Sequence, residues 1–329
     1  MVLVTGGTGL VGAHLLLHLI ENEESVRAIY RDAKTIKKTK TLFYLYKKED
    51  LFEKIEWIKA DIIDVPSLEI AFENIDYVYH CAALISFDPN DENLIRKINI
   101  EGTANIVNFC IAKSIKKLCF VSSTAALGDL KENEKVITEE TEWNPEKPHS
   151  DYAISKYGAE MEIWRGQQEG LNAVIVNPGV IIGPGFQDQG SGKLLKNIQN
   201  GLPFYTNGSM GFVSVTDVVK IMFELIKSET KNERFTLIAQ NVVFRDFFES
   251  VAKAAKIKKH SIYLSPLMIG ILWRIDWVSS TIFRKKRYLD RATAKASYSK
   301  NLYSNEKIKN TLGFKFLDVH DYVKEISSL

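Results

Sequence analysis

The sequence predicts an α/β protein built on a doubly wound parallel sheet, because strand-like and helical runs alternate through its first half and a glycine-rich turn joins the first pair. Such alternation implies a mainly parallel sheet covered on both faces. Right-handed crossovers then produce the Rossmann arrangement. The expected strands are residues 2–4, 25–30, 55–60, 77–80, 117–121 and 173–176, and the expected helices lie near residues 10–22, 34–50, 66–73, 91–113 and 150–169.

The glycine-rich turn reads Thr5-Gly6-Gly7-Thr8-Gly9-Leu10-Val11-Gly12 and stands between an apolar run and a helical stretch. Glycines there let the backbone turn tightly and approach a pyrophosphate, which would bind the free N–H groups and positive dipole of the helix start. An ordinary tight turn is the alternative, but the order of strand, turn and helix favours a dinucleotide site. Its predicted residues are Gly6, Thr8, Gly9, Leu10, Val11 and Gly12.

The domain organisation follows from where the alternation stops. Residues 1–177 are expected to form the dinucleotide-binding domain, and residues 178–329 mainly a smaller substrate-binding lobe. Segments near residues 212–240 are expected to return to the sheet. A chain of 329 residues is long enough to bury a sizeable core.

Composition and charge limit the kinds of partner that we expect the protein to bind. The chain is 45% hydrophobic and 26% charged, as in soluble globular proteins, and its net charge of +2 argues against nucleic acid as a partner. The three cysteines show neither metal-ligand spacing nor a disulfide framework, so no metal is expected. No basic-then-apolar signal peptide precedes the first strand, and we therefore expect a cytoplasmic protein.

An apolar and aromatic stretch covers residues 261–283. Arg274 and Asp276 interrupt it, which argues against a membrane-spanning helix. A buried helix or pocket wall is the favoured interpretation. The alternative is an interfacial or substrate-entry surface.

A candidate reaction centre is Tyr152-Ala153-Ile154-Ser155-Lys156. Residues four apart lie on one face of a helix, so the phenol and the ammonium can serve one site. A phenol titrates near ~10 in water, and we expect Lys156 and an oxidised nicotinamide to lower the pKa of Tyr152. Tyr152 would then exchange a proton with a substrate oxygen while hydride moves to or from carbon.

The tyrosine–lysine spacing is weak by itself, because Tyr30/Lys34, Tyr44/Lys48 and Tyr303/Lys307 match it equally well. Position favours Tyr152, which begins a helix after the strand at residues 117–121. That strand ends in Ser122-Ser123-Thr124, and open α/β sheets bind ligands at the carboxyl ends of their strands. Ser123 is the predicted partner of the reacting oxygen, with its two neighbours as alternatives. The structural alternatives are that Ser123 only belongs to a turn and that Tyr152 only packs in the core.

The end of the second strand bears on cofactor choice. Its sequence, Val26-Arg27-Ala28-Ile29-Tyr30-Arg31-Asp32, places Tyr30 or Arg31 where NAD-binding proteins carry an acidic residue. A guanidinium there would pair with a 2′-phosphate, and Lys37 and Lys38 add positive charge. NADP(H) is therefore favoured, with NAD(H) possible through Asp32. A solvated basic helix start is the structural alternative.

Together these residues resemble the extended branch of the short-chain dehydrogenase/reductase superfamily, the NAD-dependent epimerase/dehydratase superfamily. The resemblance covers nearly the whole chain. Residues 26–32 and 212–218 look most like the dihydroflavonol-4-reductase and 3β-hydroxysteroid dehydrogenase-like group. Beyond the glycine turn, the motifs that carry the resemblance are Asp61-Ile62, His80-Cys81-Ala82-Ala83, Asn99 with Gly102-Thr103, Val121-Ser122-Ser123, Tyr152–Lys156 and Asn177-Pro178-Gly179.

The resemblance implies further roles. Asn99 would join Ser123, Tyr152 and Lys156 as a catalytic residue by supporting proton relay, although it also suits a helix brace. Asp61 and Ile62 would flank the adenine, although Asp61 also suits a helix cap. The remaining implied cofactor-binding residues are Ala82, Ala83, Val121, Tyr152, Lys156, Pro178 and Val180.

Substrate class is the least specified feature. Sugar-nucleotide epimerases commonly carry an arginine where this chain has Met210-Gly211, although Lys193 or Lys196 could substitute. We therefore expect an NADP(H)-dependent reductase or dehydrogenase of a small apolar or aromatic compound. The alternatives are a nucleotide-sugar epimerase or dehydratase with bound NAD and a non-catalytic dinucleotide-binding protein. The protein is expected to be a monomer or a homodimer. Candidate pocket residues are Ile85, Phe87, Phe186, Phe204 and the stretch 267–277.

Overall fold

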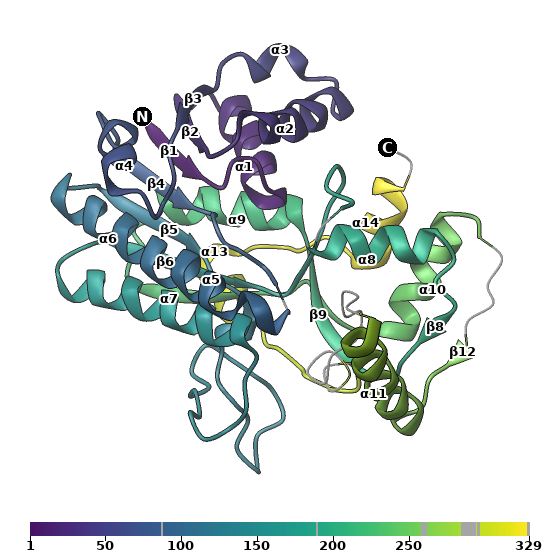
Figure 1. Ribbon diagram of the computed structural model, residues 1–329. Helices are drawn as coiled ribbons and strands as arrows, with labels where there is room; N and C mark the ends of the chain where they lie inside the picture. The colour runs from purple at the N-terminus through teal and green to yellow at the C-terminus, as the bar shows by residue number, and fades with distance from the viewer. Residues whose placement is uncertain (87, 189, 258–261, 284–293, 295–296, 328–329) are drawn as a thin grey trace.

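A seven-stranded sheet forms the centre of the computed structural model, which describes residues 1–86, 88–188, 190–257, 262–283, 294 and 297–327 (Figure 1). The strand order is β10-β6-β5-β4-β1-β2-β3, and every neighbouring pair is parallel. The strands are β1 (Val2–Thr5), β2 (Val26–Tyr30), β3 (Glu56–Lys59), β4 (Tyr77–His80), β5 (Lys117–Val121), β6 (Ala173–Pro178) and β10 (Glu233–Leu237).

Helices cover both faces of this sheet. The first face carries α1 (Leu10–Glu21), α2 (Ala33–Leu45) and α9 (Val215–Lys227), and the second carries α4 (Val65–Ala71), α6 (Gly102–Ala112) and α7 (Asp151–Gln168). Side chains of β5 alternate between the two cores: Cys119 and Val121 face the first, whereas Leu118 and Phe120 face the second. Burial on both faces explains why central strands such as β1 and β6 are mainly apolar rather than alternating, whereas the edge strand β3 is partly exposed.

The predicted Rossmann fold is confirmed, and the predicted strands are all present. Two predicted helices are interrupted. The helix near residues 34–50 divides into α2 and α3 (Glu49–Phe52), because Lys47 between them has a positive φ of 56°. The helix near residues 91–113 contains a π-helical segment, Lys97–Glu101, between α5 (Glu92–Arg96) and α6.

The rest of the chain builds a second lobe beside the carboxyl ends of the strands (Figure 1). A three-stranded sheet of order β11-β9-β7 packs against α8, α10 and α14 in a separate apolar core. Within residues 212–240, α9 and β10 belong to the main sheet layer. The lobe elements are β7 (Val180–Ile182), α8 (Gly190–Gln199), β8 (Phe204–Tyr205), β9 (Ser209–Ser214), β11 (Gln240–Val243), α10 (Phe244–Ala254), β12 (Ile262–Tyr263), α11 (Pro266–Phe283) and α14 (Val319–Ile326), while α13 (Glu306–Leu312) packs near β10.

Candidate active site

The strand order reverses between β1 and β4, which makes their carboxyl ends the expected ligand crevice of the sheet. The glycine turn follows β1, and Cys81 to Ala83 follow β4. Ser123 follows β5, the next strand along. The topology therefore brings the predicted cofactor and catalytic segments to one edge.

The glycine turn is tight because its backbone packs on itself and on the end of β4. Gly6 has φ +71°, and a Cβ there would lie 2.6 Å from the Ala82 nitrogen. A Cβ on Gly12 would lie 2.2 Å from the Gly6 oxygen. The Thr39 hydroxyl of α2 donates a 2.8 Å hydrogen bond to the Gly7 carbonyl and fixes the turn from the other side.

Gly9 is different, because the protein itself leaves room at this position. A Cβ there would meet only the Gly6 oxygen, at 3.4 Å. Gly9 is also the N-cap of α1, where no side chain caps the helix and the first turn holds no acidic residue. The helix start thus offers N–H groups and a positive dipole beside open space, which fits a pyrophosphate.

Beyond β2, the structure places positive side chains in solvent. Arg31 and Lys38 are exposed, and neither forms an ion pair within the described part of the chain. Asp32, the acidic alternative, accepts a 2.9 Å hydrogen bond from the Lys34 nitrogen and so caps α2. One oxygen of this carboxylate, Oδ1, is thereby engaged by its own helix start.

Asp61 and Ile62 follow β3. The Asp61 carboxylate accepts a hydrogen bond from the Ile63 nitrogen at 3.2 Å in a local turn, and the N-cap of the following helix α4 is Asp64, not Asp61. The Ile62 side chain is buried, and a Cβ on Gly102 would lie 2.6 Å from it. Its side chain therefore packs on α6, and adenine contact at this position would use the backbone.

The catalytic candidates meet at the start of α7. Ser150 caps this helix by accepting a 3.2 Å hydrogen bond from the Ala153 nitrogen, which sets Tyr152 in the first turn. The Tyr152 phenol lies beside the Ser123 hydroxyl, which acts to lower the pKa of the phenol. Lys156, one turn later, is buried and donates a 2.8 Å hydrogen bond from Nζ to the Val121 carbonyl. Pro178, at the end of β6, is also buried, and Val180 begins β7.

The electrostatics of Tyr152 differ from the prediction. Burial raises the pKa of its phenol, and the neighbouring Ser123 hydroxyl partly opposes this shift. Lys156 makes no comparable contribution, because its ammonium faces the Val121 carbonyl and the Phe120 ring, 4.5 Å away. Burial lowers the pKa of Lys156 itself to about 8, against a rise caused by Glu160.

Asn99 lies on the π-helical segment, where a widened turn aims its amide away from α6. Its amide binds both backbone groups of Leu84, accepting from the nitrogen at 2.8 Å and donating to the oxygen at 3.0 Å. The same amide donates a 2.9 Å hydrogen bond to the Ser155 hydroxyl, which in turn donates to the Tyr152 carbonyl at 2.8 Å. Asn99 thus braces the helix turn that carries Tyr152.

Behind the site lie two buried polar residues: Glu160, which sequence reasoning missed, and Asn177, which was named only as part of a family motif. Glu160 is wholly buried and accepts a 2.5 Å hydrogen bond from Asn177, whose amide also donates to the Ser123 carbonyl at 3.0 Å. The available signal was helical spacing, since Glu160 follows Lys156 by four residues on α7.

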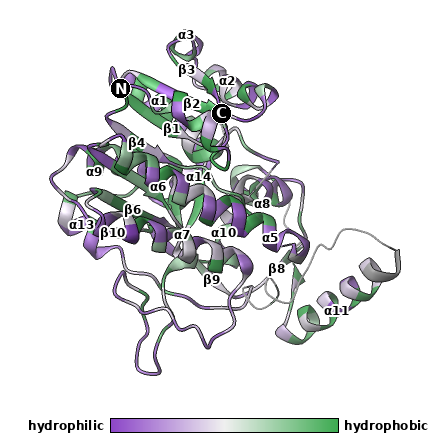
Figure 2. Ribbon diagram, turned by 60° about the vertical axis from the view of Figure 1, so that its left-hand side comes forward, coloured by the Kyte–Doolittle hydropathy of each residue, from purple (hydrophilic) through white to green (hydrophobic). Residues whose placement is uncertain are grey.

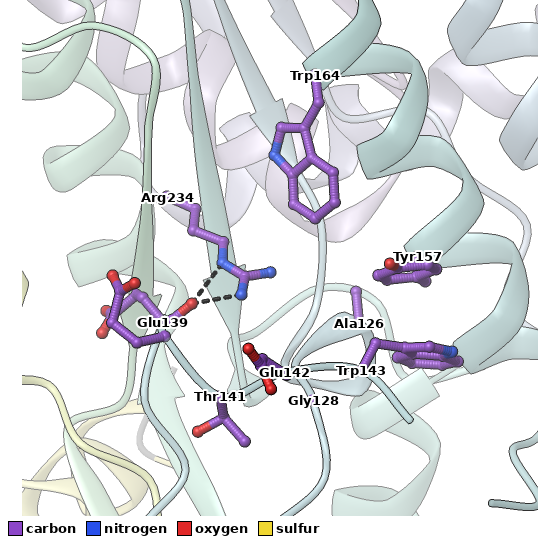
Figure 3. Close-up of a pocket in the computed structure, with 10 residues that line it drawn as sticks. Ala126, Gly128, Glu139, Thr141, Glu142, Trp143, Tyr157, Trp164 and Arg234 are labelled. Atoms are coloured by element: carbon purple, nitrogen blue, oxygen red, sulfur yellow. Dashed lines mark hydrogen bonds between the residues drawn. The ribbon is translucent and has the colours of Figure 1, made fainter. Parts of the chain in front are cut away.

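A cavity of about 420 Å³ opens on the other side of α7, beside Tyr157 (Figure 3). Figure 3 shows Arg234 between Trp164 and the Glu139 backbone; its Nε donates to the Glu139 carbonyl at 2.8 Å. Trp143 stacks on Tyr157 with ring centroids 4.4 Å apart. None of the predicted catalytic residues lines this cavity, so it is separate from the candidate active site.

The structure contradicts one of the predicted substrate-pocket residues and leaves two others exposed. Phe186 is wrong as a pocket residue, because it is buried against Ala13 and Leu42 in a small core beneath α1 and α2. Ile85 and Phe204 are exposed, and Phe87 lies outside the described residues. The predicted buried helix at residues 261–283 is also wrong in the described part, since most apolar side chains of α11 are exposed.

The fold and the glycine turn define a dinucleotide-binding protein, and its similarity to known proteins shows that it is an NAD(P)-dependent oxidoreductase that acts on CH–OH or carbonyl groups. The profile of the NAD dependent epimerase/dehydratase family matches residues 2–237, and the chain belongs to that family. The predicted likeness to the extended short-chain dehydrogenase/reductases is thereby confirmed.

Among proteins of known name, a putative dihydroflavonol 4-reductase of Synechocystis is 30% identical over 246 residues, which cover 73% of this chain and 68% of that protein. Anthocyanidin reductase of Arabidopsis thaliana is 30% identical over 72% of this chain and 75% of its own length. Among solved structures, UDP-glucose 4-epimerase of Thermotoga maritima superposes with a TM-score of 0.77 at 20% identity, covering 99% of this chain and 97% of that one. This last likeness concerns the fold alone.

Proposed function

We propose that this chain is an NADP(H)-dependent reductase or dehydrogenase, which transfers hydride between nicotinamide and the carbonyl or hydroxyl carbon of a small apolar or aromatic compound. The observation that carries the proposal is that the Tyr152 and Ser123 side chains lie side by side at the sheet edge that holds the glycine turn. The names of two similar proteins, a dihydroflavonol reductase and an anthocyanidin reductase, support a reductase.

Each catalytic candidate has a distinct role in this proposal. Tyr152 gives a proton to the carbonyl oxygen during reduction and takes it back during oxidation. Ser123 donates a hydrogen bond to the same oxygen and orients it. Lys156 binds the nicotinamide ribose, and Asn99 holds the first turn of α7 through Ser155. When bound, the nicotinamide supplies or accepts the hydride, and its oxidised form adds the positive charge that favours phenolate.

Two observations support NADP(H) over NAD(H). The exposed guanidinium of Arg31 has the planar donor geometry that phosphate binds, and Lys38 adds a second positive charge on α2. The Asp32 carboxylate caps α2, so a ribose hydroxyl would compete with the Lys34 nitrogen for it. We therefore assign the adenosine 2′-phosphate to Arg31 and Lys38.

Packing of β9 supports a substrate other than a nucleotide sugar. Gly211 lies opposite Asn241 of β11, and a Cβ at Gly211 would lie 2.3 Å from the Ile238 side chain. Met210 packs in the apolar core of the lobe. An arginine for a diphosphate has no room at Gly211. Of the two lysines that could substitute, Lys196 is paired with Asp188 at 3.3 Å, whereas Lys193 is exposed.

The test is a screen of carbonyl and alcohol compounds with NADPH and NADH, followed by Tyr152→Phe on the best substrate. We expect a loss of turnover of at least about 100-fold, with NADPH affinity kept within a few-fold. Tyr44→Phe is the matched control, because Tyr44 has the same spacing to a lysine but is exposed on α2. Unchanged turnover in Tyr152→Phe would overturn the proposal.

A nucleotide-sugar epimerase or dehydratase with tightly held NAD is the second candidate. The observation in its favour is the full-length likeness of fold to UDP-glucose 4-epimerase. Denaturing the purified protein and identifying the released nucleotide separates the two, because this candidate predicts stoichiometric NAD. Dinucleotide binding without turnover of any compound would instead indicate a non-catalytic protein.

A further inference from the structure

Helix α11 presents an apolar face to solvent. Leu267 is 75% exposed, Ile271 50% and Ile275 59%. These residues recur every four positions, so they form one line along the helix, which Val278 extends. Monomeric proteins rarely leave such contiguous apolar surface uncovered, and its presence marks an interaction site.

The opposite side of α11 faces the protein. Ile269 is buried with Leu264, and Trp273, one turn after Ile269, packs against the same small core. Helical geometry places Ile269 and Trp273 about 180° from the exposed line. Figure 2 shows α11 at the edge of the molecule, beyond β8. The exposed line of side chains on α11 therefore points toward solvent rather than into the protein.

Positive charge is concentrated in the sequence around this helix. Residues 253–287 contain nine lysines and arginines and one acidic residue, Asp276, although the whole chain has a net charge of only +2. The described part of this run includes Lys253 and Lys256 at the end of α10 and exposed Arg274, whose guanidinium lies 4.7 Å from the Trp273 ring. An apolar line within a basic run complements an anionic lipid surface.

We propose that the exposed face of α11, comprising Leu267, Ile271, Ile275 and Val278, docks the protein on the surface of an anionic phospholipid membrane. The apolar side chains enter the interface, and the positive charge of this sequence run, including the exposed Arg274 on the helix itself, selects anionic headgroups. No helix in the described ranges is long and apolar enough to cross a membrane, so docking is peripheral. A second copy of the chain is a poorer occupant, because pairing through this face would bring two basic segments together. The proposal is independent of the catalytic one.

The first test uses the full-length native protein and vesicles. Cosedimentation is measured with phosphatidylcholine vesicles containing about a third phosphatidylglycerol and with pure phosphatidylcholine vesicles. We expect at least tenfold tighter binding to the anionic vesicles, and weaker binding at high salt, where the Debye length is only about 3 Å. Absence of binding, or equal binding to both vesicles, would overturn the proposal.

The second test asks whether vesicle binding depends on the apolar face of α11 or on charge alone. The double variant Ile271→Asp/Ile275→Asp should lose at least tenfold in affinity for the anionic vesicles. The matched control is Val65→Asp/Ile70→Asp on α4, where Ile70 is 58% exposed, and it should bind as the native protein does. Equal effects of the two variants would attribute the loss to charge alone and refute the apolar face. A native dimer that only the α11 variant converts to monomer, without vesicle binding, would assign the face to a second copy instead.

Discussion

Glu160 and Asn177 are joined inside the protein by a 2.5 Å hydrogen bond from the amide to the carboxylate. The same amide donates to the Ser123 carbonyl, so the buried carboxylate and the predicted catalytic serine share one anchor. Arg234 approaches the other carboxylate oxygen at 3.2 Å. Burial raises the pKa of Glu160, while Arg234 and Asn177 act in the opposite direction.

Glu160→Gln should lower the free energy of unfolding by about 3 kcal/mol, because losing one partner of a buried pair leaves Arg234 uncompensated. Urea unfolding measures this. The matched control is Glu162→Gln on the same helix, whose partner Arg165 lies 2.8 Å away at the surface. Surface pairs contribute less than about 1 kcal/mol, so equal losses in the two variants would contradict a buried ion pair.

The glycine turn allows binding to be separated from folding. Gly12→Ala should reduce both stability and dinucleotide affinity, because its Cβ would lie 2.2 Å from the Gly6 carbonyl oxygen. Gly9→Ala should leave thermal stability nearly unchanged, since its Cβ would meet only one atom at 3.4 Å. It should nevertheless weaken NADPH binding at least tenfold, because the methyl group takes the space assigned to the pyrophosphate. Native affinity in Gly9→Ala would contradict that assignment.

Arg31→Asp tests the cofactor preference. Replacing the guanidinium with a carboxylate should weaken NADPH at least tenfold through repulsion of the 2′-phosphate, with little effect on NADH. Fluorescence titration with both nucleotides measures the ratio. Lys54→Asp carries the same charge change at the amino end of β3, away from the predicted site, and should alter neither affinity. Equal weakening of both nucleotides by Arg31→Asp would refute a 2′-phosphate contact.

The fold was predictable because its signals are local. Central parallel strands such as β5 are runs buried on both faces, and helices such as α9 show a clear helical periodicity. The glycine turn combines a local motif with a local context. The predicted catalytic residues follow from the same logic, because the end of β5 and the start of α7 are both visible in sequence.

The remaining features depend on long-range contacts that no local pattern encodes. Asn177 reaches Glu160 and Ser123 only because β6 pairs with β5 under α7. Phe186 has the composition of a pocket residue, but its loop packs on α1 and α2. The widened turn at Asn99 is set by the bonds with Leu84 and Ser155. In α11, apolar composition alone could not distinguish a buried helix from an exposed one.

His14 should make the protein less stable in mild acid. Burial lowers the pKa of this histidine to about 4, although the Leu10 carbonyl raises it. Between pH 6.5 and 4 the unfolded chain binds a proton that the folded chain excludes, so the free energy of unfolding falls as pH falls, by roughly 1.4 kcal/mol per pH unit. His14→Gln should remove this part of the slope and leave the profile above pH 7 parallel to that of the native protein. Urea unfolding across pH 4.5–8 measures both, and an identical acid slope in the variant would show that the His14 ring accepts its proton in the folded state.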